Sequence, residues 1–355
     1  MGLELLIENI RNQYKEGLPF VLFSLPESES IMGLLQKDSQ IYETDTFTTR
    51  GVVIAPFKFD ETAFCIPEEH SDVFEVPMIK ESIDISEIRI DESNEEKNRY
   101  IQLVKEALQA IVRKRASKIV LSRQKKIPIT QIDFTSLVTR LFNLYPTAFR
   151  YIWYHPKTGL WAGASPEVLV KTENTSFFSM ALAGTQKILN KVPIYWSDKE
   201  ITEQYFVTEA ITNSLQKVSD VLKVSKTYTY EAGSVAHLRT DITGVLKNKK
   251  ATLKTISAAL HPTPAVCGTP KIEAKNFIFE HEGYDREFYT GFIGPICGDN
   301  TCSNLFVNLR CMKIDENEVT LFSGGGITSD SEPISEWLET VNKLQTMLQV
   351  IQPML

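Results

Sequence analysis

The chain has 355 residues, with 38 Lys and Arg against 45 Asp and Glu and 43% apolar residues. This apolar fraction excludes a largely disordered chain. The net charge of −7, without a long basic run, argues against nucleic acid as a partner. No stretch reaches the roughly 18 apolar residues of a membrane-spanning helix, and charged residues interrupt the apolar residues at the N-terminus. We therefore expect a cytoplasmic protein without a membrane segment.

The cysteines and histidines do not follow the spacing of a metal site. The five cysteines include no CxxC pair, and their odd number suits a reducing compartment better than a disulfide framework. We expect all five to be buried thiols. The five histidines lack the HxxxH and HxxEH spacings, so zinc is not expected. The residues concerned are Cys65, Cys267, Cys297, Cys302, Cys311, His70, His155, His237, His261 and His281.

The order of predicted elements indicates the fold class. Residues 76–98 are rich in charge and form the best candidate domain boundary. Apolar residues from Tyr100 to Ile111 then recur with the period of an amphipathic helix. A strand is predicted at 118–129, and helical patterns cover about 198–222, 251–260 and 333–350. Many strands with a few long helices predict an α+β fold of large sheets. Further strands are predicted at FRYIWYH (149–155), LWAGAS (160–165), EVLVKTE (167–173), FFSMALAG (177–184), FIGPICG (292–298), LFVNLRCMKI (305–314) and VTLFSGGGI (319–327).

Three consecutive glycines, Gly324, Gly325 and Gly326, come at the end of the last predicted strand. Without side chains they allow backbone N–H groups to approach an anion closely. The GKS or GKT ending of a phosphate-binding P-loop is absent, so nucleotide binding is not favoured. A small carboxylate ligand fits this segment better.

Two pairs of glutamates lie at the starts of predicted helices. Glu200 and Glu203 are three residues apart, as are Glu336 and Glu339, and Lys343 follows Glu339 by four. Acidic residues near a helix N-terminus complement its dipole, and the order Glu–Lys at this spacing favours a surface ion pair. Two such pairs also suit Mg²⁺, which takes one or a few carboxylates together with waters and an anionic substrate. Spacing alone favours the surface interpretation.

Three charged side chains stand among apolar neighbours. Lys118 alternates with apolar residues in its strand, and burial would lower its pKa toward that of a general base; a lysine at a strand edge is the alternative. Glu167 follows a proline at a turn and is either a carboxyl kept protonated by burial or a simple turn residue. Arg310 lies in an apolar strand, where a guanidinium needs a carboxylate from a ligand or from the protein.

Taken in chain order, these segments resemble the chorismate-utilising enzymes over residues 97–351. The resemblance implies large antiparallel sheets packed with helices, a chorismate-binding catalytic domain at 97–351, and a variable portion at 1–90 that contributes strands to the same fold. Nine separated blocks in the same order make the resemblance specific. They are SKIVLSR, GASPE, ALAGT, KEITEQ, LHPTPAVCGTPK, YDREFYTGFIG, LFVNLRC, FSGGGI and SEPISEWLETVNKL.

Within this family the resemblance is greatest to isochorismate synthases. Anthranilate synthases have glutamine at the position of Lys118, and aminodeoxychorismate synthases have lysine at that of Ala183. The HPTPAV block looks most like the isochorismate synthases, while salicylate synthases share Lys118 and Ala183. The chain departs from the commonest pattern at Gln186, often arginine, and at Ser323 and Gly325, often alanines.

The resemblance implies a reaction and a set of roles. Lys118 would deprotonate a water that attacks C2 of chorismate, and Glu167 would protonate the departing C4 hydroxyl, giving isochorismate. Mg²⁺ would be the cofactor, with no redox cofactor, no amidotransferase subunit and a monomer by default; the product would feed menaquinone or siderophore synthesis. A salicylate synthase, which also eliminates pyruvate, and a catalytically silent chorismate-binding subunit are the alternatives. The metal would be held by Glu203, Glu336 and Glu339 with Glu200 nearby, and the substrate by Gly184, Thr185, His261, Tyr289, Arg310, Gly324 and Lys343.

Overall fold

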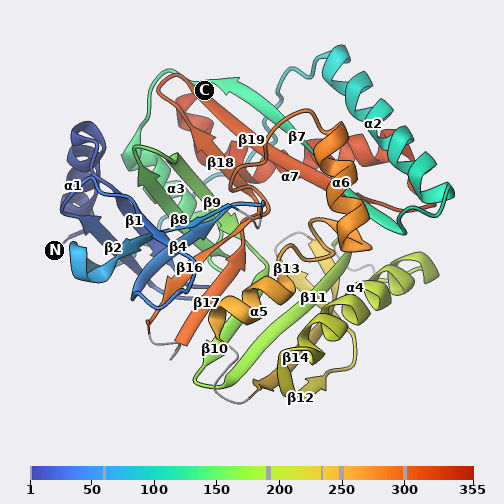
Figure 1. Ribbon diagram of the computed structural model, residues 1–355. Coiled ribbons are helices and arrows are strands. Elements are labelled where there is room, and N and C mark those ends of the chain that lie inside the picture. Colours follow the sequence, from blue (N-terminus) through green and yellow to red (C-terminus); the bar gives the residue numbers. More distant parts are fainter. Residues whose placement is uncertain (1, 59–60, 189–192, 233–234, 248–251, 299–301) are drawn as a thin grey trace.

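Two large antiparallel sheets pack face to face, and helices cover their outer sides (Figure 1). The computed structural model describes residues 2–58, 61–188, 193–232, 235–247, 252–298 and 302–355. The predicted α+β class with large sheets is therefore confirmed.

In the described parts of the chain the first sheet has nine strands, and every neighbouring pair is antiparallel. In spatial order the strands are β15 (Gly268–Thr269), β7 (Lys118–Pro128), β19 (Glu318–Ile327), β18 (Cys311–Ile314), β9 (Gly159–Ser165), β8 (Phe149–His155), β1 (Phe20–Ser24), β2 (Ser30–Gln36) and β6 (Ser71–Pro77).

The second sheet is also antiparallel, and β13 (Tyr228–Ala232) pairs with β14 off its main path. In spatial order its strands are β12 (Ser219–Val224), β14 (Val235–Leu246), β11 (Ser176–Lys187), β10 (Val168–Glu173), β17 (Cys302–Val307), β16 (Phe292–Ile296), β4 (Gly51–Ala55), β5 (Ala63–Pro67) and β3 (Tyr42–Thr44).

Alternating burial along the strands divides the core into layers. In β1, Val21 and Phe23 face the second sheet, whereas Phe20 and Leu22 face the helices. Successive strand residues point to opposite faces, so a strand that is apolar on both faces is covered on both sides. The cores on the outer sides are completed by α1 (Leu3–Glu16), α3 (Phe134–Leu144) and α7 (Pro333–Ile351) on the first sheet, α4 (Asp198–Gln216) and α5 (Leu253–Leu260) on the second, and α2 (Asn94–Val112) and α6 (Lys271–His281) beside β7.

Strands from the N-terminal residues belong to both sheets. β1 pairs with β8, and β4 pairs with β16. The charge-rich segment that marked a candidate boundary has no helix or strand between β6 and α2. It therefore joins parts that share the same two sheets.

One predicted strand is wrong. Residues 305–314 were expected to form a single strand, but β17 belongs to the second sheet and β18 to the first. Between them Arg310 adopts a left-handed backbone conformation (φ 47°), which breaks the extended chain. The predicted helix at 198–222 ends at Gln216, and the helices α1, α3 and α6 were not predicted.

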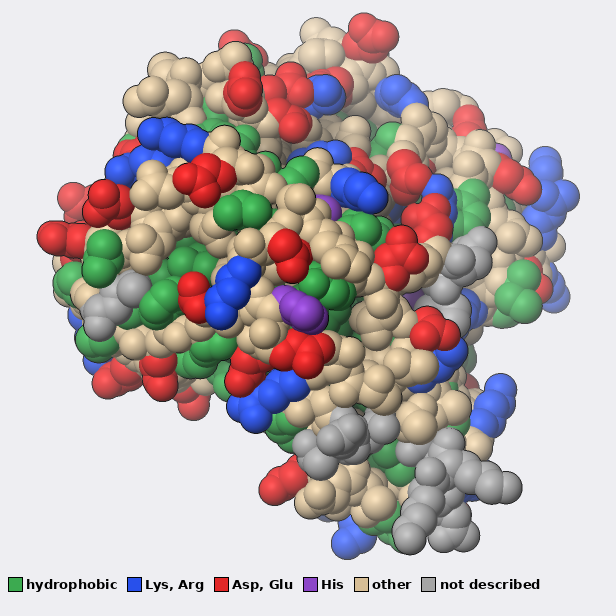
Figure 2. Space-filling view, turned by 60° about the vertical axis from the view of Figure 1, so that its left-hand side comes forward, with side chains coloured by type: hydrophobic (Ala, Val, Ile, Leu, Met, Phe, Trp, Pro, Cys, Tyr) green, Lys and Arg blue, Asp and Glu red, His purple; other side chains and the backbone are tan. Residues whose placement is uncertain are grey.

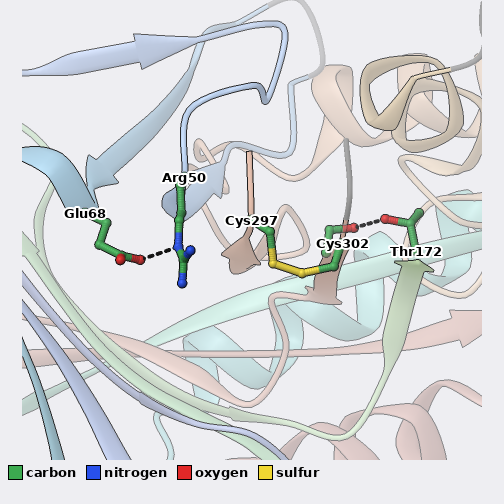
Figure 3. Close-up of a disulfide and its surroundings, with 6 residues drawn as sticks. Arg50, Glu68, Thr172, Cys297 and Cys302 are labelled. Carbon is green, nitrogen blue, oxygen red and sulfur yellow. Dashed lines mark hydrogen bonds and ion pairs between the residues drawn. A yellow bond between two sulfur atoms is a disulfide. The ribbon is translucent and has the colours of Figure 1, made fainter. Parts of the chain in front are cut away.

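The expectation of five free thiols is wrong at two positions. Cys297 and Cys302 form a disulfide at the end of the β16–β17 hairpin, near the ion pair of Arg50 and Glu68 (Figure 3). The hairpin places the two cysteines opposite each other, since the Cys297 amide donates to the Cys302 carbonyl at 3.0 Å. The number of cysteines in the sequence does not show which of them lie close together in the fold. The remaining cysteines, Cys65, Cys267 and Cys311, are buried thiols, as expected.

The surface agrees with the charge balance of the chain. Acidic and basic side chains are interspersed over the face shown in Figure 2, and basic side chains do not gather into one patch there. Within the described ranges no helix has the length and apolar character needed to cross a membrane.

Candidate active site

A cavity of about 520 Å³ lies between the two sheets, where β7 and β19 face β11. The starts of α4 and α7 complete its wall. Among the predicted site residues whose side chains the structure describes, all line it except His261. Thr185 lies in β11, but its side chain is outside the described residues. The predicted residues that the fold brings together here are Lys118, Glu167, Gly184, Glu200, Glu203, Tyr289, Arg310, Gly324, Glu336, Glu339 and Lys343.

His261 is not among the side chains that line the cavity, contrary to the expectation. It is buried, and its Nε2 lies 3.2 Å from the carbonyl oxygens of Pro56 and Phe57. Burial lowers its pKa to about 4, so the imidazole is neutral at physiological pH. The same segment contributes Ala265 and Val266 to the cavity wall instead.

Glu167 is placed to act as a proton donor. It follows Pro166 in the turn between β9 and β10, and only 5% of its surface is exposed. Burial raises its pKa to about 7, although the nearby positive charge of Lys118 acts in the opposite direction. A carboxyl group with this pKa is protonated in a substantial fraction of the molecules at neutral pH.

Lys118 begins β7 and points into the cavity. Its strand alternates as predicted, since Lys118 and Val120 line the cavity while Ile119 and Leu121 join the core with α2 and α6. The lysine is buried, and its Nζ donates to Glu203 Oε1 at 2.7 Å. The side chain therefore has one defined carboxylate partner.

Gly326 on β19 provides the space for Lys118. A Cβ atom at this position would lie 2.6 Å from Lys118 Cε and 3.2 Å from Nζ. Real Cβ atoms do not approach other atoms to 2.6 Å, so only glycine leaves the lysine in its place.

The glutamates of α7 face the cavity together with Lys343. Lys343 Nζ lies 2.5 Å from Glu339 Oε1 and 2.9 Å from the carbonyl oxygen of Gly324. Burial alone would raise the pKa of Glu339, but Lys343, Arg310 and Lys118 together lower it, so this carboxylate is ionised. Glu336 is buried beside β19.

Glu200 has a different environment from Glu203. It closes a capping box at the start of α4, where its carboxylate accepts from the Ser197 amide at 2.8 Å. Gln186 Nε2 donates to both of its oxygens at 3.0 Å. These contacts fix the first turn of α4 and thereby aim Glu203 into the cavity.

The carboxylates suit a hard divalent cation in their chemistry. Glu203, Glu336 and Glu339 supply oxygen donors to one cavity, and Mg²⁺ needs only one or a few carboxylates with waters and substrate. Among the described residues, no three acidic, histidine or cysteine side chains converge into a preformed metal site. The donor set fits Mg²⁺ in its chemistry; in this structure Glu203 is paired with Lys118, and Glu339 with Lys343.

Arg310 and Tyr289 form a further part of the wall. Arg310 forms no ion pair with the residues that the structure describes, although it lines the cavity. Tyr289 is buried, and its hydroxyl lies 3.1 Å from the position that a Cβ of Gly324 would take. The guanidinium is thus placed to meet an anionic ligand beside the glycine strand.

Sequence reasoning missed several residues of the wall. His237 on β14 lines the cavity, with Nδ1 2.9 Å from the Gly184 carbonyl oxygen, and burial lowers its pKa. Thr290 and Val266 line it as well. No spacing signal marks these residues, because they reach the cavity only through the packing of distant segments.

Comparisons with known proteins identify the family of the chain. The sequence model of the family described as chorismate binding enzyme matches residues 46–352. Isochorismate synthase EntC of Escherichia coli K12 is 33% identical over 265 residues, which cover 72% of this chain and 67% of that protein. The chain therefore belongs to the chorismate binding enzymes, and the predicted resemblance is confirmed.

Solved structures show the same fold. A putative 2,3-dihydroxybenzoate-specific isochorismate synthase, DhbC from Bacillus anthracis, superposes with a TM-score of 0.80 at 25% identity, covering 98% of this chain and 99% of that one. Anthranilate synthase component I from Streptococcus pneumoniae matches with a TM-score of 0.68 at 18% identity, covering 92% of each chain, which supports the fold alone.

Proposed function

We propose that the protein is an isochorismate synthase that converts chorismate to isochorismate. The observation that carries the proposal is the presence of Lys118 and Glu167 in one cavity, with the pKa of Glu167 raised to about 7 by burial. A general base and a general acid of this kind are what an exchange of hydroxyl groups requires. The sequence identity between this chain and EntC, and the fold that it shares with DhbC, support the same activity.

The proposed reaction balances without a redox step. Lys118 accepts a proton from water as the water oxygen bonds to C2 of the ring. Both ring double bonds shift, from C1=C2 and C5=C6 to C1=C6 and C4=C5. The bond between C4 and its hydroxyl breaks, and Glu167 gives its proton to that hydroxyl, which leaves as water. The product has the same composition as the substrate, so the enzyme is an isomerase. This chain has Ala183 at the position where aminodeoxychorismate synthases have lysine. The absence of this amine is consistent with water as the nucleophile.

The cavity also contains charges that suit a dianionic substrate. Arg310 and Lys343 would bind the carboxylate of the enolpyruvyl arm, next to Gly324 and Tyr289. Glu203, Glu336 and Glu339 would hold Mg²⁺, and the ion would neutralise the ring carboxylate of chorismate. The net charge of the chain is −7, but the positive charges in the cavity would still bind an anionic substrate locally.

Product analysis tests the proposed activity. Purified protein is incubated with chorismate and Mg²⁺, and the products are separated by chromatography; we expect isochorismate. Salicylate with pyruvate, or an aromatic amine formed with ammonia, would overturn the assignment. Chorismate binding by calorimetry without any product would instead identify a silent binding subunit.

The metal assignment has a separate test. Glu203→Gln removes one charged oxygen donor, and we expect weaker Mn²⁺ binding in paramagnetic resonance titrations as well as a higher Mg²⁺ requirement for turnover. Glu231→Gln, an exposed carboxylate on β13 that does not line the cavity, is the control. Unchanged Mn²⁺ binding in Glu203→Gln would contradict the assignment.

A further inference from the structure

Among the residues that the structure describes, no strand pairs with the outer edge of β7 along most of its length. β19 pairs with β7 on one side from Ile119 to Pro128, whereas β15 on the other side pairs only with Lys118 and Ile119. Beyond β15, the Val120 amide donates to the carbonyl oxygen of Cys267 at 2.9 Å. The Val120 carbonyl and the Ser122 amide then need partners from elsewhere, because buried backbone groups are almost always hydrogen-bonded.

A buried ion pair supplies these partners. Arg286 Nη2 donates to the Val120 carbonyl at 2.8 Å, and the Ser122 amide donates to Glu282 Oε1 at 2.8 Å. Both side chains are only 1% exposed, and Arg286 Nε donates to Glu282 Oε2 at 2.8 Å. The two side chains thus offer a donor and an acceptor to β7 in the order that a neighbouring strand would.

All five N–H groups of the Arg286 guanidinium have acceptors. Two of these bonds, from Nη2 to the Val120 carbonyl and from Nε to Glu282 Oε2, are described above, and Nη2 makes a second contact with Glu282 Oε1. Nη1 donates to the Val266 carbonyl at 2.9 Å and to Thr290 Oγ1 at 3.2 Å. The charge of Glu282 and the hydrogen bonds to it raise the pKa of Arg286 against the opposing effect of burial. A lysine has three N–H donors on one atom and cannot reproduce this fork.

The acceptors belong to three separate segments of the cavity wall. Val120 lies two residues after Lys118 on β7, Val266 lies in the loop before β15, and Thr290 follows Tyr289. Each of the three lines the cavity, whereas Arg286 and Glu282 do not. One guanidinium therefore sets the relative positions of the strand that carries the base and of two further wall segments.

We propose that Arg286 and Glu282 are positioning residues for the reaction: the pair replaces a missing strand beside β7 and holds Lys118 in line with the wall around Tyr289. This inference rests on the proposed function, since it assigns the pair to catalysis by Lys118. A misplacement of about 1 Å in a reacting group can cost roughly a hundredfold in rate. Arg286 and Glu282 do not line the cavity, so we expect their loss to act on turnover rather than on substrate affinity.

The test is a steady-state comparison of Arg286→Lys with the wild-type protein. Arg286→Lys keeps the charge but loses the fork, and we expect kcat to fall about 10- to 100-fold, with KM for chorismate nearly unchanged. Rates are measured well below the unfolding midpoint of each variant and are expressed per folded molecule. A kcat equal to that of the wild type would overturn the proposal.

The matched control is Arg150→Lys. Arg150 on β8 is equally buried and donates to the carbonyl of Phe142 at 2.6 Å and to Ser24 Oγ at 2.8 Å, but it does not line the cavity or contact its wall segments. We expect this variant to have a lower unfolding midpoint and an unchanged kcat. An equal loss of kcat in both variants would show that any buried arginine has this effect and would overturn the proposal.

A second variant covers the case in which Arg286→Lys does not fold. Glu282→Gln keeps the size of the side chain. In the wild-type protein one carboxylate oxygen accepts from Arg286 Nε and the other from the Ser122 amide, whereas glutamine has only one oxygen and can accept only one of these bonds. The same fall in kcat with unchanged KM is expected, and wild-type kcat would overturn the proposal. If the wild-type protein itself forms no isochorismate, the proposed function fails first, which separates the two failures.

Discussion

The chemistry proposed for the cavity depends on a carboxyl group that keeps a proton near neutral pH. Glu167 is 5% exposed, and burial in the turn after β9 disfavours its ionised form. Its pKa of about 7 is useful for a general acid. The same burial has a cost in stability, which depends on pH.

Glu167→Gln is expected to stabilise the fold at alkaline pH. Between the ordinary pKa of 4.5 and about 7, the folded wild-type protein retains a proton that the unfolded chain releases. Stability associated with this group is therefore present below pH 4.5 and is lost as the pH rises through 7, by about 3 kcal/mol in total. The neutral amide does not titrate, so the variant gains up to this amount at pH 8 and little at pH 5, while turnover is lost.

Urea unfolding at both pH values measures this difference. Glu173→Gln is the control, since Glu173 at the end of β10 is exposed, and it should show no such gain. Equal stability of Glu167→Gln and the wild-type protein at pH 8 would contradict the raised pKa.

Lys118→Ala is expected to reduce kcat by roughly 10²- to 10⁴-fold, the usual effect of removing a general base. Lys125→Ala is the control on the same strand. Lys125 is equally buried, but it points to the opposite face of β7 and binds Glu96 and the Asp91 carbonyl. Steady-state rates of isochorismate formation measure the effect, and a Lys118→Ala enzyme with near-wild-type turnover would rule out the lysine as the base.

The strand β19 shows how a single element shapes the site. Its register with β7 places Gly326 opposite Val120 and Gly324 opposite Ser122. The glycines keep one side of the cavity open where Lys118 and Tyr289 approach β19 closely. A methyl group added to different glycines of this strand should therefore have different effects.

Gly326→Ala is expected to lower kcat at least about tenfold. The new Cβ would lie 2.6 Å from Lys118 Cε and would therefore displace the lysine side chain. The fold should persist, since the displaced atoms are the flexible end of a side chain. Gly325→Ala, whose Cβ would meet only Glu336 Oε2 at 3.0 Å and Tyr100 OH at 3.9 Å, should have a smaller effect. Steady-state rates and thermal unfolding of both variants check this order, and the reverse order would contradict it.

The chain as a whole depends on its N-terminal quarter. The strands β1, β2 and β6 continue the first sheet, and β3, β4 and β5 continue the second. Val21, Phe23, Val52 and Ile54 lie in the core between the sheets. These residues are needed to cover the apolar faces of β8, β16 and their neighbours.

A fragment of residues 94–355 is therefore expected not to fold. It would expose the edges of β8 and β16 and remove one end of the core between the sheets. Circular dichroism during heating should show a cooperative transition for the full chain and none for the fragment. A fragment that unfolds cooperatively and binds chorismate would show that the N-terminal portion is dispensable.

Much of the fold could be predicted from local patterns. The helix at Tyr100–Ile111 and the strand from Lys118 follow from periodicity, which a chain expresses over a few turns or pleats. The break at Arg310 could not be predicted, because its neighbours are as apolar as those of a continuous strand. The left-handed backbone conformation is needed only because the chain crosses there from one sheet to the other. The position of His261 behind the wall and the disulfide of Cys297 with Cys302 depend on contacts between distant segments.

The sequence by itself determined the residue types and the order of the blocks that identify the family, since these are properties of the linear chain. It also determined which face of β7 carries Lys118, because strand residues alternate with a period of two. Only the tertiary structure decided which charges meet: that Lys118 contacts Glu203, that Glu167 is buried enough to keep a proton, and that Arg286 completes the edge of β7. Solvation and hydrogen bonding depend on distances between segments far apart in the chain, and these distances exist only once the two sheets have packed.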